Sequence, residues 1–205
     1  MIKTICVFCG SSTGEDPVYA ERAERLALFF LEKKINLVYG GANVGLMRIL
    51  ADKMLRGNGH VTGVMPKNLV HREVAHLDLT EMHIVEDMQE RKALMARLSD
   101  AFLTLPGAYG TFDELFEMLT WNQLHVIEKP VGLLNVKGFF NPLLEMLNKA
   151  VEEKFLRTEH RGILLAEDNE EVLLKRMNKY KPVVAEKWIQ RLKQVNGNST
   201  QLGMP

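Results

Sequence analysis

Short, almost continuous apolar runs recur along the chain, and this is the pattern of strands that are buried on both faces of a sheet. The predicted strands are residues 4–8, 36–39, 60–65, 83–85, 101–105, 131–135 and 162–166. Between most of these runs, apolar residues recur at the three- and four-residue spacing of a helix with one buried side. The predicted helices are residues 17–33, 44–56, 88–99, 112–125, 141–154 and 169–179. The alternation predicts an α/β fold in which helices cover both faces of a mainly parallel sheet.

The chain shows no internal repeat, low-complexity tract or linker, so residues 1–182 are predicted to form a single domain. Residues 183–195 fit one last helix. The stretch after it is polar and contains glycine, so the end of the chain, up to residue 205, is expected to be disordered.

Charge and hydropathy exclude two classes of partner. Lys plus Arg and Asp plus Glu each number 26 among the 205 residues, so the formal net charge is zero. A nucleic-acid binder that works by bulk charge has a basic excess. No apolar run approaches the roughly 20 residues that span a bilayer, and the first residues enter a strand pattern without a signal-peptide layout. We therefore expect a cytosolic protein that binds neither nucleic acid nor membrane.

The two cysteines, Cys6 and Cys9, have the C-x-x-C spacing of redox and metal motifs. They stand before a Gly-Ser-Ser turn rather than at a helix start, and no second pair exists to complete a zinc site. The six histidines show no metal-ligand spacing either. The sequence therefore predicts no metal.

Three turns that follow predicted strands carry small residues, and in sheets of this kind ligands bind where strands lead into helices. The turns are residues 9–14, 39–45 and 106–111. A single glycine-rich turn often only closes a loop, but three in one chain favour a shared nucleotide site. The third turn, LPGAYGT, lies between a buried strand and a helix start, so its backbone N–H groups can hold a phosphate.

Glu114 is the candidate catalytic carboxylate. A structural alternative is a capping box, with Thr111 as N-cap and Glu114 at N3. On a helical wheel the predicted core stripe consists of Phe112, Leu115, Phe116 and Leu119. Glu114 lies away from this stripe, so we expect it to be free to face a cleft rather than being buried.

Arg91 is out of place on its helix. The apolar stripe there consists of Met88, Leu94, Met95 and Leu98. Arg91 falls inside the stripe, where a guanidinium costs free energy unless it is paired. We interpret Arg91 as a residue at the site edge that pairs with a carboxylate and a ligand oxygen; the alternative is an arginine that reaches the surface or makes a structural ion pair. Lys92, near the stripe's edge, either binds phosphate or a carboxylate or is simply solvated.

Taken together, these motifs resemble the LONELY GUY (LOG) family of cytokinin riboside 5′-monophosphate phosphoribohydrolases, proteins once described as lysine decarboxylases. The resemblance rests on C-V-F-C-G-S-S at 6–12, L-V-Y-G-G at 37–41, G-L-M at 45–47, E-R-K at 90–92 and P-G-x-Y-G-T-x-x-E at 106–114. It runs from residue 1 to about residue 180.

The resemblance implies a Rossmann-like, doubly wound fold, usually as a homodimer with the site at the edge of the subunit interface. It implies that a cytokinin-type or adenine nucleoside 5′-monophosphate is cleaved at its N-glycosidic bond to the free base and ribose 5-phosphate, with no metal or organic cofactor. Arg91 and Glu114 match the family's catalytic pair. The positions that match substrate-contacting or pocket-lining residues are Ser11, Ser12, Gly40, Gly41, Gly45, Met47, Glu73, Lys92, Gly107, Ala108, Tyr109, Gly110, Thr111, Asp113 and Thr120.

Cleavage of an N-glycosidic bond passes through a state that is positive at ribose C1′. Glu114 is expected to stabilise that charge and to orient or deprotonate the attacking water. Arg91 is expected to keep Glu114 ionised and to contact the nucleotide.

Several positions depart from the family pattern. Ala108 stands where the family usually has glycine, and Asp113 replaces a glutamate. The others are Ala42 and Arg48 in place of glycines and Asn122 in place of alanine. If position 108 requires a positive φ, Ala108 is strained and its methyl group crowds the phosphate.

Two other functions remain open on the sequence. One is a general AMP or purine nucleotide nucleosidase, and the other is a nucleotide-binding module that does not cleave its ligand. Lysine decarboxylation is disfavoured because no convincing lysine site for pyridoxal phosphate is seen. Oxidoreduction is disfavoured because no clean G-x-G-x-x-G occurs and no acidic residue ends the second strand.

Overall fold

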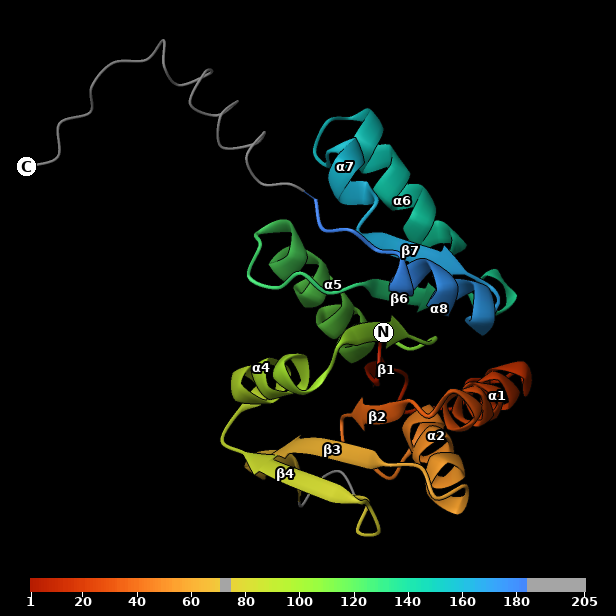
Figure 1. Ribbon diagram of the computed structural model, residues 1–205. Coiled ribbons are helices and arrows are strands. Elements are labelled where there is room, and N and C mark those ends of the chain that lie inside the picture. Colours follow the sequence, from red (N-terminus) through yellow and green to blue (C-terminus); the bar gives the residue numbers. More distant parts are fainter. Residues whose placement is uncertain (71–74, 184–205) are drawn as a thin grey trace, which may run out of the picture.

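The structure, a computed structural model, describes residues 1–70 and 75–183. Its strands form one seven-stranded sheet in the order β4-β3-β2-β1-β5-β6-β7, and all neighbouring strands run parallel (Figure 1). The strands are β1 (Thr4–Phe8), β2 (Asn36–Tyr39), β3 (Val61–Pro66), β4 (Glu81–Val85), β5 (Ala101–Thr104), β6 (Val131–Leu134) and β7 (Leu164–Glu167). The predicted fold class is confirmed, and each predicted strand is present.

Helices cover both faces of the sheet (Figure 1). One face carries α1 (Val18–Lys33), α2 (Gly45–Arg56) and α8 (Glu170–Asn178), and the other carries α4 (Met88–Leu98), α5 (Tyr109–Gln123) and α6 (Asn141–Glu152). Within the described residues the structure also has three short helices that the sequence does not predict, because so few residues show no helical spacing; they are α3 (Lys67–Val70), η1 (Val136–Gly138) and α7 (Thr158–Arg161).

The core lies in two layers, one on each side of the sheet. Alternate residues of β1 serve the two layers: Ile5 and Val7 pack with α1 and α2, whereas Cys6 and Phe8 pack with α4 and α5. Successive side chains of a strand point to opposite faces. A strand covered on both faces therefore needs apolar residues at every position, which explains the continuous apolar runs.

The order of the strands reverses direction at β1. The chain runs outward from β1 through β2, β3 and β4, then crosses back so that β5 pairs with the free side of β1. Loops at the carboxyl ends of β1 and β5 therefore diverge to opposite faces and leave a crevice between them. Two of the three predicted small-residue turns lie at this crevice.

Helix α5 begins at Tyr109, three residues before its predicted start. Thr111 is consequently inside the helix and Ala108 is the N-cap, so the capping-box alternative for Thr111 and Glu114 is wrong. The buried side of the helix also differs from the predicted stripe. It consists of Thr111, Glu114, Leu115, Met118 and Asn122, whereas Phe112, Phe116 and Leu119 are half-buried.

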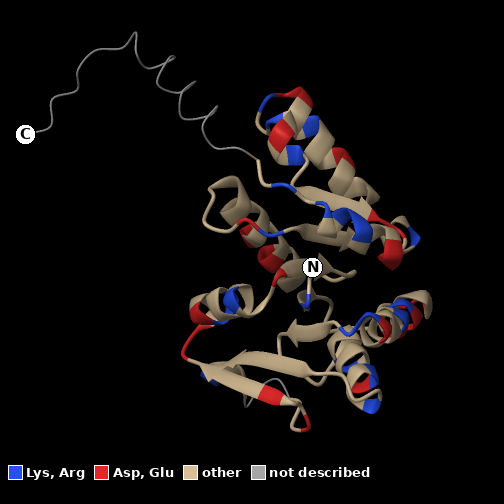
Figure 2. Cartoon of the chain, in the orientation of Figure 1, with Lys and Arg blue, Asp and Glu red and all other residues tan. Residues whose placement is uncertain are grey.

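Acidic and basic residues are mixed over the helices, and neither sign gathers on one side of the view in Figure 2. Within the described ranges, no helix has the length and apolar character needed to cross a bilayer. The predicted last helix and disordered end, beyond residue 183, lie outside the described residues.

Candidate active site

The three small-residue turns are joined through the backbone of Gly10. Its N–H donates to the carbonyl of Pro106 (3.0 Å), and its own carbonyl accepts from the N–H of Leu46 (3.1 Å). Gly45, at φ +53°, begins α2 so close to the first turn that an added Cβ would lie 2.3 Å from the carbonyl carbon of Ser11. Glycine is required here by both conformation and space. The predicted convergence of the turns is confirmed.

A cavity of about 360 Å³ opens where these turns meet. Ten of the predicted site residues line it: Ser11, Ser12, Met47, Arg91, Gly107, Ala108, Gly110, Thr111, Asp113 and Glu114. Gly40, Gly41 and Gly45 are not among the lining residues; they stand in the turn that follows β2 and at the start of α2. Glu73 falls outside the described residues, so its role stays a prediction.

The amino-terminal end of α5 faces this cavity. No side chain among the described residues caps this end, and the first turn holds no acidic residue. The first N–H groups of a helix lack intrahelical partners and carry a partial positive charge, so they are suited to an anion such as phosphate. Gly107 has to be glycine, since a Cβ there would lie 2.1 Å from the hydroxyl oxygen of Thr111. Ala108 has φ −124°, so the strain considered for a positive φ at this position does not arise.

Arg91 is buried and held by backbone carbonyls. Its Nε donates to the carbonyl of Val64 (2.9 Å), and its Nη2 donates to that of Gly40 (3.2 Å). Its Nη1 lies 3.4 Å from Oε1 of Glu114. The predicted pairing of a core-facing arginine with a carboxylate is confirmed. Gly40 makes room for it, because a Cβ at that position would lie 2.0 Å from Nη2.

Glu114 lines the cavity as expected, but it is buried, with only 9% of the residue exposed. The expectation that it is free rather than buried is therefore wrong: it is both at the cavity and out of bulk water. Burial raises the pKa of Glu114 from 4.5 to about 7, and Arg91 opposes this shift without cancelling it. Arg91 therefore does not keep Glu114 fully ionised at neutral pH. A carboxyl group with a pKa near 7 is able both to accept and to donate a proton.

Lys92 is buried as well, contrary to the solvated alternative. Its Nζ lies 3.1 Å from Asp113 Oδ2 and 2.9 Å from Glu117 Oε2. Burial lowers the pKa of Lys92, but the hydrogen bonds to Glu117 and Asp113 outweigh this and leave it raised. The lysine is thus a fixed positive charge between α4 and α5. It is not among the residues that line the cavity.

Part of the cavity wall is apolar and comes from elements far apart in the sequence. Tyr19 of α1 and Phe139, which follows η1, meet edge to face with ring centroids 6.0 Å apart. Cys9 also lines the cavity, and burial raises the pKa of its thiol well above the usual range. The sequence did not identify this wall, because nothing local marks two aromatic residues 120 positions apart as neighbours.

Two predicted contact residues point elsewhere. Tyr109 is 93% exposed at the start of α5. Thr120 lines a separate hollow of about 110 Å³ between α5, α6 and α7. Their roles toward a ligand stay predictions. In the described ranges, no group of three or more His, Cys, Asp or Glu side chains is placed to hold a metal ion.

The chain matches known proteins along most of its length. A family model described as "Possible lysine decarboxylase" matches residues 47–177. "Cytokinin riboside 5'-monophosphate phosphoribohydrolase LOG7" of Arabidopsis thaliana is 47% identical over 180 residues, which cover 88% of this chain and 83% of that protein. "Probable cytokinin riboside 5'-monophosphate phosphoribohydrolase LOGL2" of Oryza sativa subsp. japonica is 46% identical over 180 residues, covering 88% and 74%.

Solved structures with much lower identity share the architecture. The molybdenum cofactor binding protein of Rippkaea orientalis has a TM-score of 0.64 at 19% identity, over 87% of this chain and 97% of that one. The molybdenum cofactor carrier protein of Chlamydomonas reinhardtii has a TM-score of 0.64 at 16% identity, over 88% and 100%. At such identity the likeness shows the fold alone.

Proposed function

The chain belongs to the LOG family, and on that premise we propose that it hydrolyses the N-glycosidic bond of a nucleoside 5′-monophosphate, releasing the free base and ribose 5-phosphate. The observation that carries the proposal is the pairing of two features in one cavity. Glu114, buried and with a pKa of about 7, contacts Arg91 there, and the uncapped start of α5 faces the same space.

The start of α5 supplies the phosphate-binding part of the proposal. Backbone N–H groups of Gly107 to Thr111 and the helix dipole would hold the 5′-phosphate. Because Glu114 stands in the next turn of the same helix, binding of the phosphate fixes the distance between the sugar and the carboxylate. A nucleoside without the phosphate lacks this fixing contact and is expected to react far more slowly.

Glu114 supplies the chemical part. Its ionised form stabilises the positive charge that develops at C1′ and takes a proton from the attacking water. The oxygen of that water bonds to C1′ as the C1′–N bond breaks, and the departing base nitrogen takes up a proton, so that the elements of water are divided between ribose and base. Near neutral pH both forms of Glu114 are populated, so the reaction is expected to accelerate as pH rises through about 7. Arg91 contacts Glu114 through Nη1 and is fixed by carbonyls through Nε and Nη2, which leaves it suited to hold the carboxylate in one orientation.

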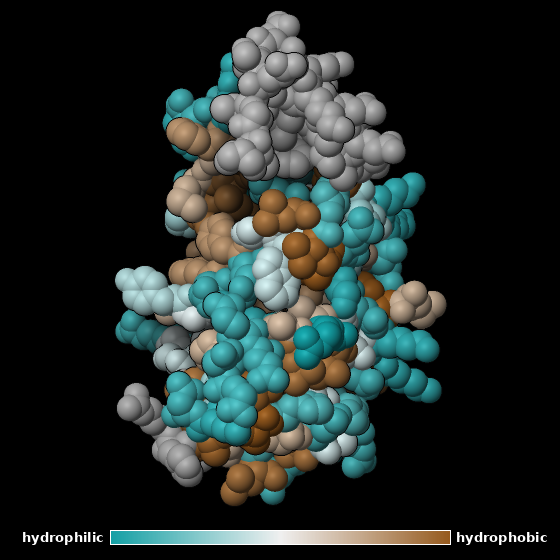
Figure 3. Space-filling model, turned by 90° about the vertical axis from the view of Figure 1, so that its left-hand side faces the viewer, coloured by the Kyte–Doolittle hydropathy of each residue, from teal (hydrophilic) through white to brown (hydrophobic). Residues whose placement is uncertain are grey.

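We also propose that the active form is a homodimer. Apolar side chains are exposed near the ends of α4 and α5, including Leu98 (37%), Leu124 (59%) and Val126 (64%). Figure 3 views the side of the molecule on which α4 and α5 lie, and apolar side chains gather there among polar ones. Tyr109 and Thr120 both belong to α5, so a second copy of the chain packed against α5 would give both residues a surface to contact. Light scattering during gel filtration measures the mass directly, and a monomer at all concentrations would contradict this proposal.

The apolar part of the cavity bears on the choice of base. The apolar wall of Tyr19 and Phe139 accepts a large hydrophobic group, which favours a cytokinin-type nucleotide with an isoprenoid substituent over plain AMP. Asp113, at the cavity rim and held by Lys92, is a short carboxylate that leaves additional room.

The deciding experiment is chromatographic detection of base released from four compounds: AMP, isopentenyladenosine 5′-monophosphate, and the two corresponding nucleosides. Release that depends on the 5′-phosphate is the expected result. The ratio of rates for the two nucleotides distinguishes a cytokinin-type enzyme from a general purine nucleotide nucleosidase.

Binding of nucleotide without release of base would instead support a non-catalytic binding module. Decarboxylation of lysine through pyridoxal phosphate requires a lysine amine in the cavity to form a Schiff base. The described residues that line the cavity include no lysine, and Lys92 nearby is held by two carboxylates. Incubation with lysine and pyridoxal phosphate, followed by chromatographic detection of the diamine product, would test this, and no product is expected.

A further inference from the structure

Two adjacent carbonyl groups of the turn that follows β2 accept hydrogen bonds from different parts of the chain. The carbonyl of Gly40 accepts from Nη2 of Arg91 (3.2 Å), and that of Gly41 accepts from the backbone N–H of His76 (3.0 Å). Ala42 and Ala75 extend the second contact as an isolated antiparallel bridge. The short segment of Ala75 and His76 therefore contacts the same turn that fixes Arg91.

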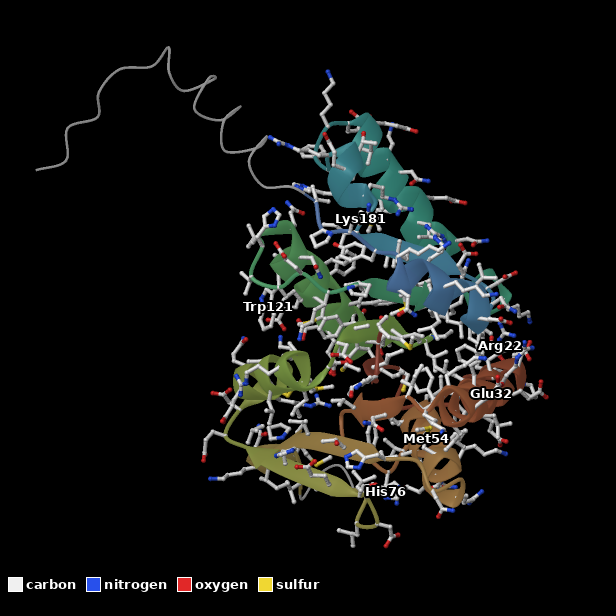
Figure 4. All side chains as sticks on the ribbon, in the orientation of Figure 1. Arg22, Glu32, Met54, His76, Trp121 and Lys181 are labelled. Atoms are coloured by element: carbon white, nitrogen blue, oxygen red, sulfur yellow. The ribbon has the colours of Figure 1, made fainter. Side chains whose placement is uncertain are left out.

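The imidazole of His76 secures this segment to α2. The residue is 4% exposed, and its Nε2 lies 2.9 Å from Oδ1 of Asp52. The backbone N–H of Asp78 donates to Nδ1 (3.3 Å). Since Nδ1 accepts, the proton is assigned to Nε2, which donates to the carboxylate. In Figure 4 the labelled His76 lies between α2 and the region where β4 begins.

The turn between these contacts is tightly packed. Gly41 has φ +78°, and its Cα would lie 2.9 Å from a Cβ added to Gly63 of β3. On the other side, a Cβ on Gly40 would lie 2.0 Å from Nη2 of Arg91. A close-packed turn transmits displacement rather than absorbing it. Only the two peptide units of Gly40 and Gly41 separate the backbone of His76 from the guanidinium of Arg91.

We propose that His76 and Asp52 form a positioning pair that sets the Arg91 guanidinium against Glu114. The pair does not touch the cavity; it acts through the Gly40 and Gly41 carbonyls. The importance of this for turnover rests on the function proposed above, but the placement of Arg91 can be tested without it.

The electrostatics of Glu114 provide a readout that a merely structural role would not move. Arg91 lowers the pKa of Glu114, so a displaced Arg91 leaves that pKa higher than about 7. The other titratable groups facing Glu114 are Lys92 of α4, Asp113 and Glu117 of α5, and Cys6 and Cys9 of β1 and its turn. Among the described residues, the side chains of these groups form no hydrogen bond or ion pair with His76 or with the turn after β2. A shift in the pKa of Glu114 caused by a substitution at His76 therefore reports on the position of Arg91.

The experiment compares three variants of the full chain. His76→Asn keeps an oxygen near the place of Nδ1 but is too short to reach Asp52. His76→Gln reaches Asp52 with its amide and is the rescue variant. Leu173→Ala, in the fully buried core of α8, is the control for loss of stability without contact to the turn.

Titration of Glu114 by carbon-13 NMR of labelled glutamate carboxyls, assigned with Glu114→Gln, measures the effect directly. His76→Asn is expected to raise the Glu114 midpoint by about 0.5 pH unit, whereas His76→Gln and Leu173→Ala shift it by less than about 0.2. With nucleotide substrate, His76→Asn is expected to lower kcat about tenfold with little change in KM, because orientation rather than binding is lost.

Unchanged titration and kcat in His76→Asn, with stability lowered as in Leu173→Ala, would overturn the proposal. If His76→Asn does not fold, Asp52→Ala removes the acceptor from a half-exposed position and must raise the Glu114 midpoint in the same way, or the proposal fails. A raised midpoint in a protein that releases no base would retain the positioning pair and reject the proposed hydrolysis.

Discussion

Glu114 in α5 and Glu170 in α8 are both buried, but on opposite faces of the sheet and in different surroundings. Glu170 stands in the first turn of its helix; one carboxylate oxygen contacts Nε of Arg25, and the other lies 3.6 Å from Nη2 of Arg22. Glu114 contacts Arg91 at a single oxygen, 3.4 Å away, and lies at the cavity.

The surroundings of a buried carboxylate decide whether it serves the stability of the fold or its chemistry. Two arginines of α1 contact Glu170 at the start of α8, so this buried carboxylate joins the two helices. At Glu114, Arg91 lowers the pKa by less than burial raises it, so the pKa of this carboxyl group lies near neutral. Ionisation of such a group lowers the stability of the folded protein. Buried carboxyl groups of this kind are typical of sites where a proton is transferred.

The largest expected effect separates the two residues by activity. Glu114→Gln is expected to lower kcat for nucleotide hydrolysis about 10³-fold or more, because the amide neither stabilises positive charge at C1′ nor accepts a proton. Glu170→Gln, the matched control, is expected to keep kcat within about twofold because its carboxylate lies in the other layer. Steady-state kinetics on both variants, with circular dichroism to verify folding, makes the comparison. Equal losses in the two variants would contradict the assignment of Glu114.

A smaller loss is expected when the arginine rather than the carboxylate is disturbed. Gly40→Ala places a methyl carbon 2.0 Å from Nη2 of Arg91, so the guanidinium has to move away from Glu114. We expect kcat to fall about 10²-fold while the protein stays folded, because the end of a flexible side chain yields before the backbone does. Gly162→Ala is the control, since φ there is −69° and the nearest atom would lie 3.3 Å from the new Cβ. Full activity in Gly40→Ala would mean that the Arg91 position is not required.

The same contrast shows how far the sequence predicts this site. Arg91 is recognisable because a charge inside an apolar stripe has few structural explanations, and its partner Glu114 follows from the turn pattern. The burial of Lys92 is not recognisable in the sequence, because its partners Asp113 and Glu117 belong to another helix. His76 is missed for a similar reason: its partner Asp52 lies 24 positions away, and an isolated histidine in a loop carries no local signal.

The fold follows more completely from local pattern than the site does. A strand buried on both faces has to be apolar throughout, so β1 and β5 are visible in the sequence at nearly their observed bounds. The start of α5 is mistaken by three residues because Gly110 and Tyr109 are weak helix formers, and the close packing of Gly107 on Gly10 and Thr111, which is a tertiary contact, determines where the helix begins.

Stability is expected to change in opposite directions at the two glutamates. The pKa of Glu114 is raised in the folded protein, so its contribution is fully present below its unfolded pKa of 4.5 and is lost as pH rises through about 7. Glu114→Gln is therefore expected to gain about 1–3 kcal/mol relative to wild type between pH 5 and pH 8. Glu170→Gln is expected to lose about 1–2 kcal/mol at pH 8, because Arg22 and Arg25 are left without their carboxylate.

Urea unfolding of wild type and both variants at pH 5 and pH 8 measures these changes. The sign of the Glu114→Gln effect is the informative result. If that variant is less stable than wild type at pH 8 by as much as Glu170→Gln, then Glu114 is held as a structural ion pair, and the contrast between the two glutamates does not exist.

The smallest expected effect concerns Ala108, where the family usually has glycine. Its φ of −124° suits any residue, so Ala108→Gly relieves no strain. Glycine is preferred to alanine at an N-cap, but it also gives the unfolded chain more freedom, and these contributions of about 0.5 kcal/mol each nearly cancel. We expect stability within about 0.5 kcal/mol of wild type and kcat/KM within about twofold. A rise in kcat/KM of about tenfold would instead mean that the methyl group crowds the phosphate. The uncapped start of α5 would then be a phosphate site that the methyl group of Ala108 partly blocks. The comparison of Glu114 with Glu170 would in that case have to include the anion that binds at the start of α5.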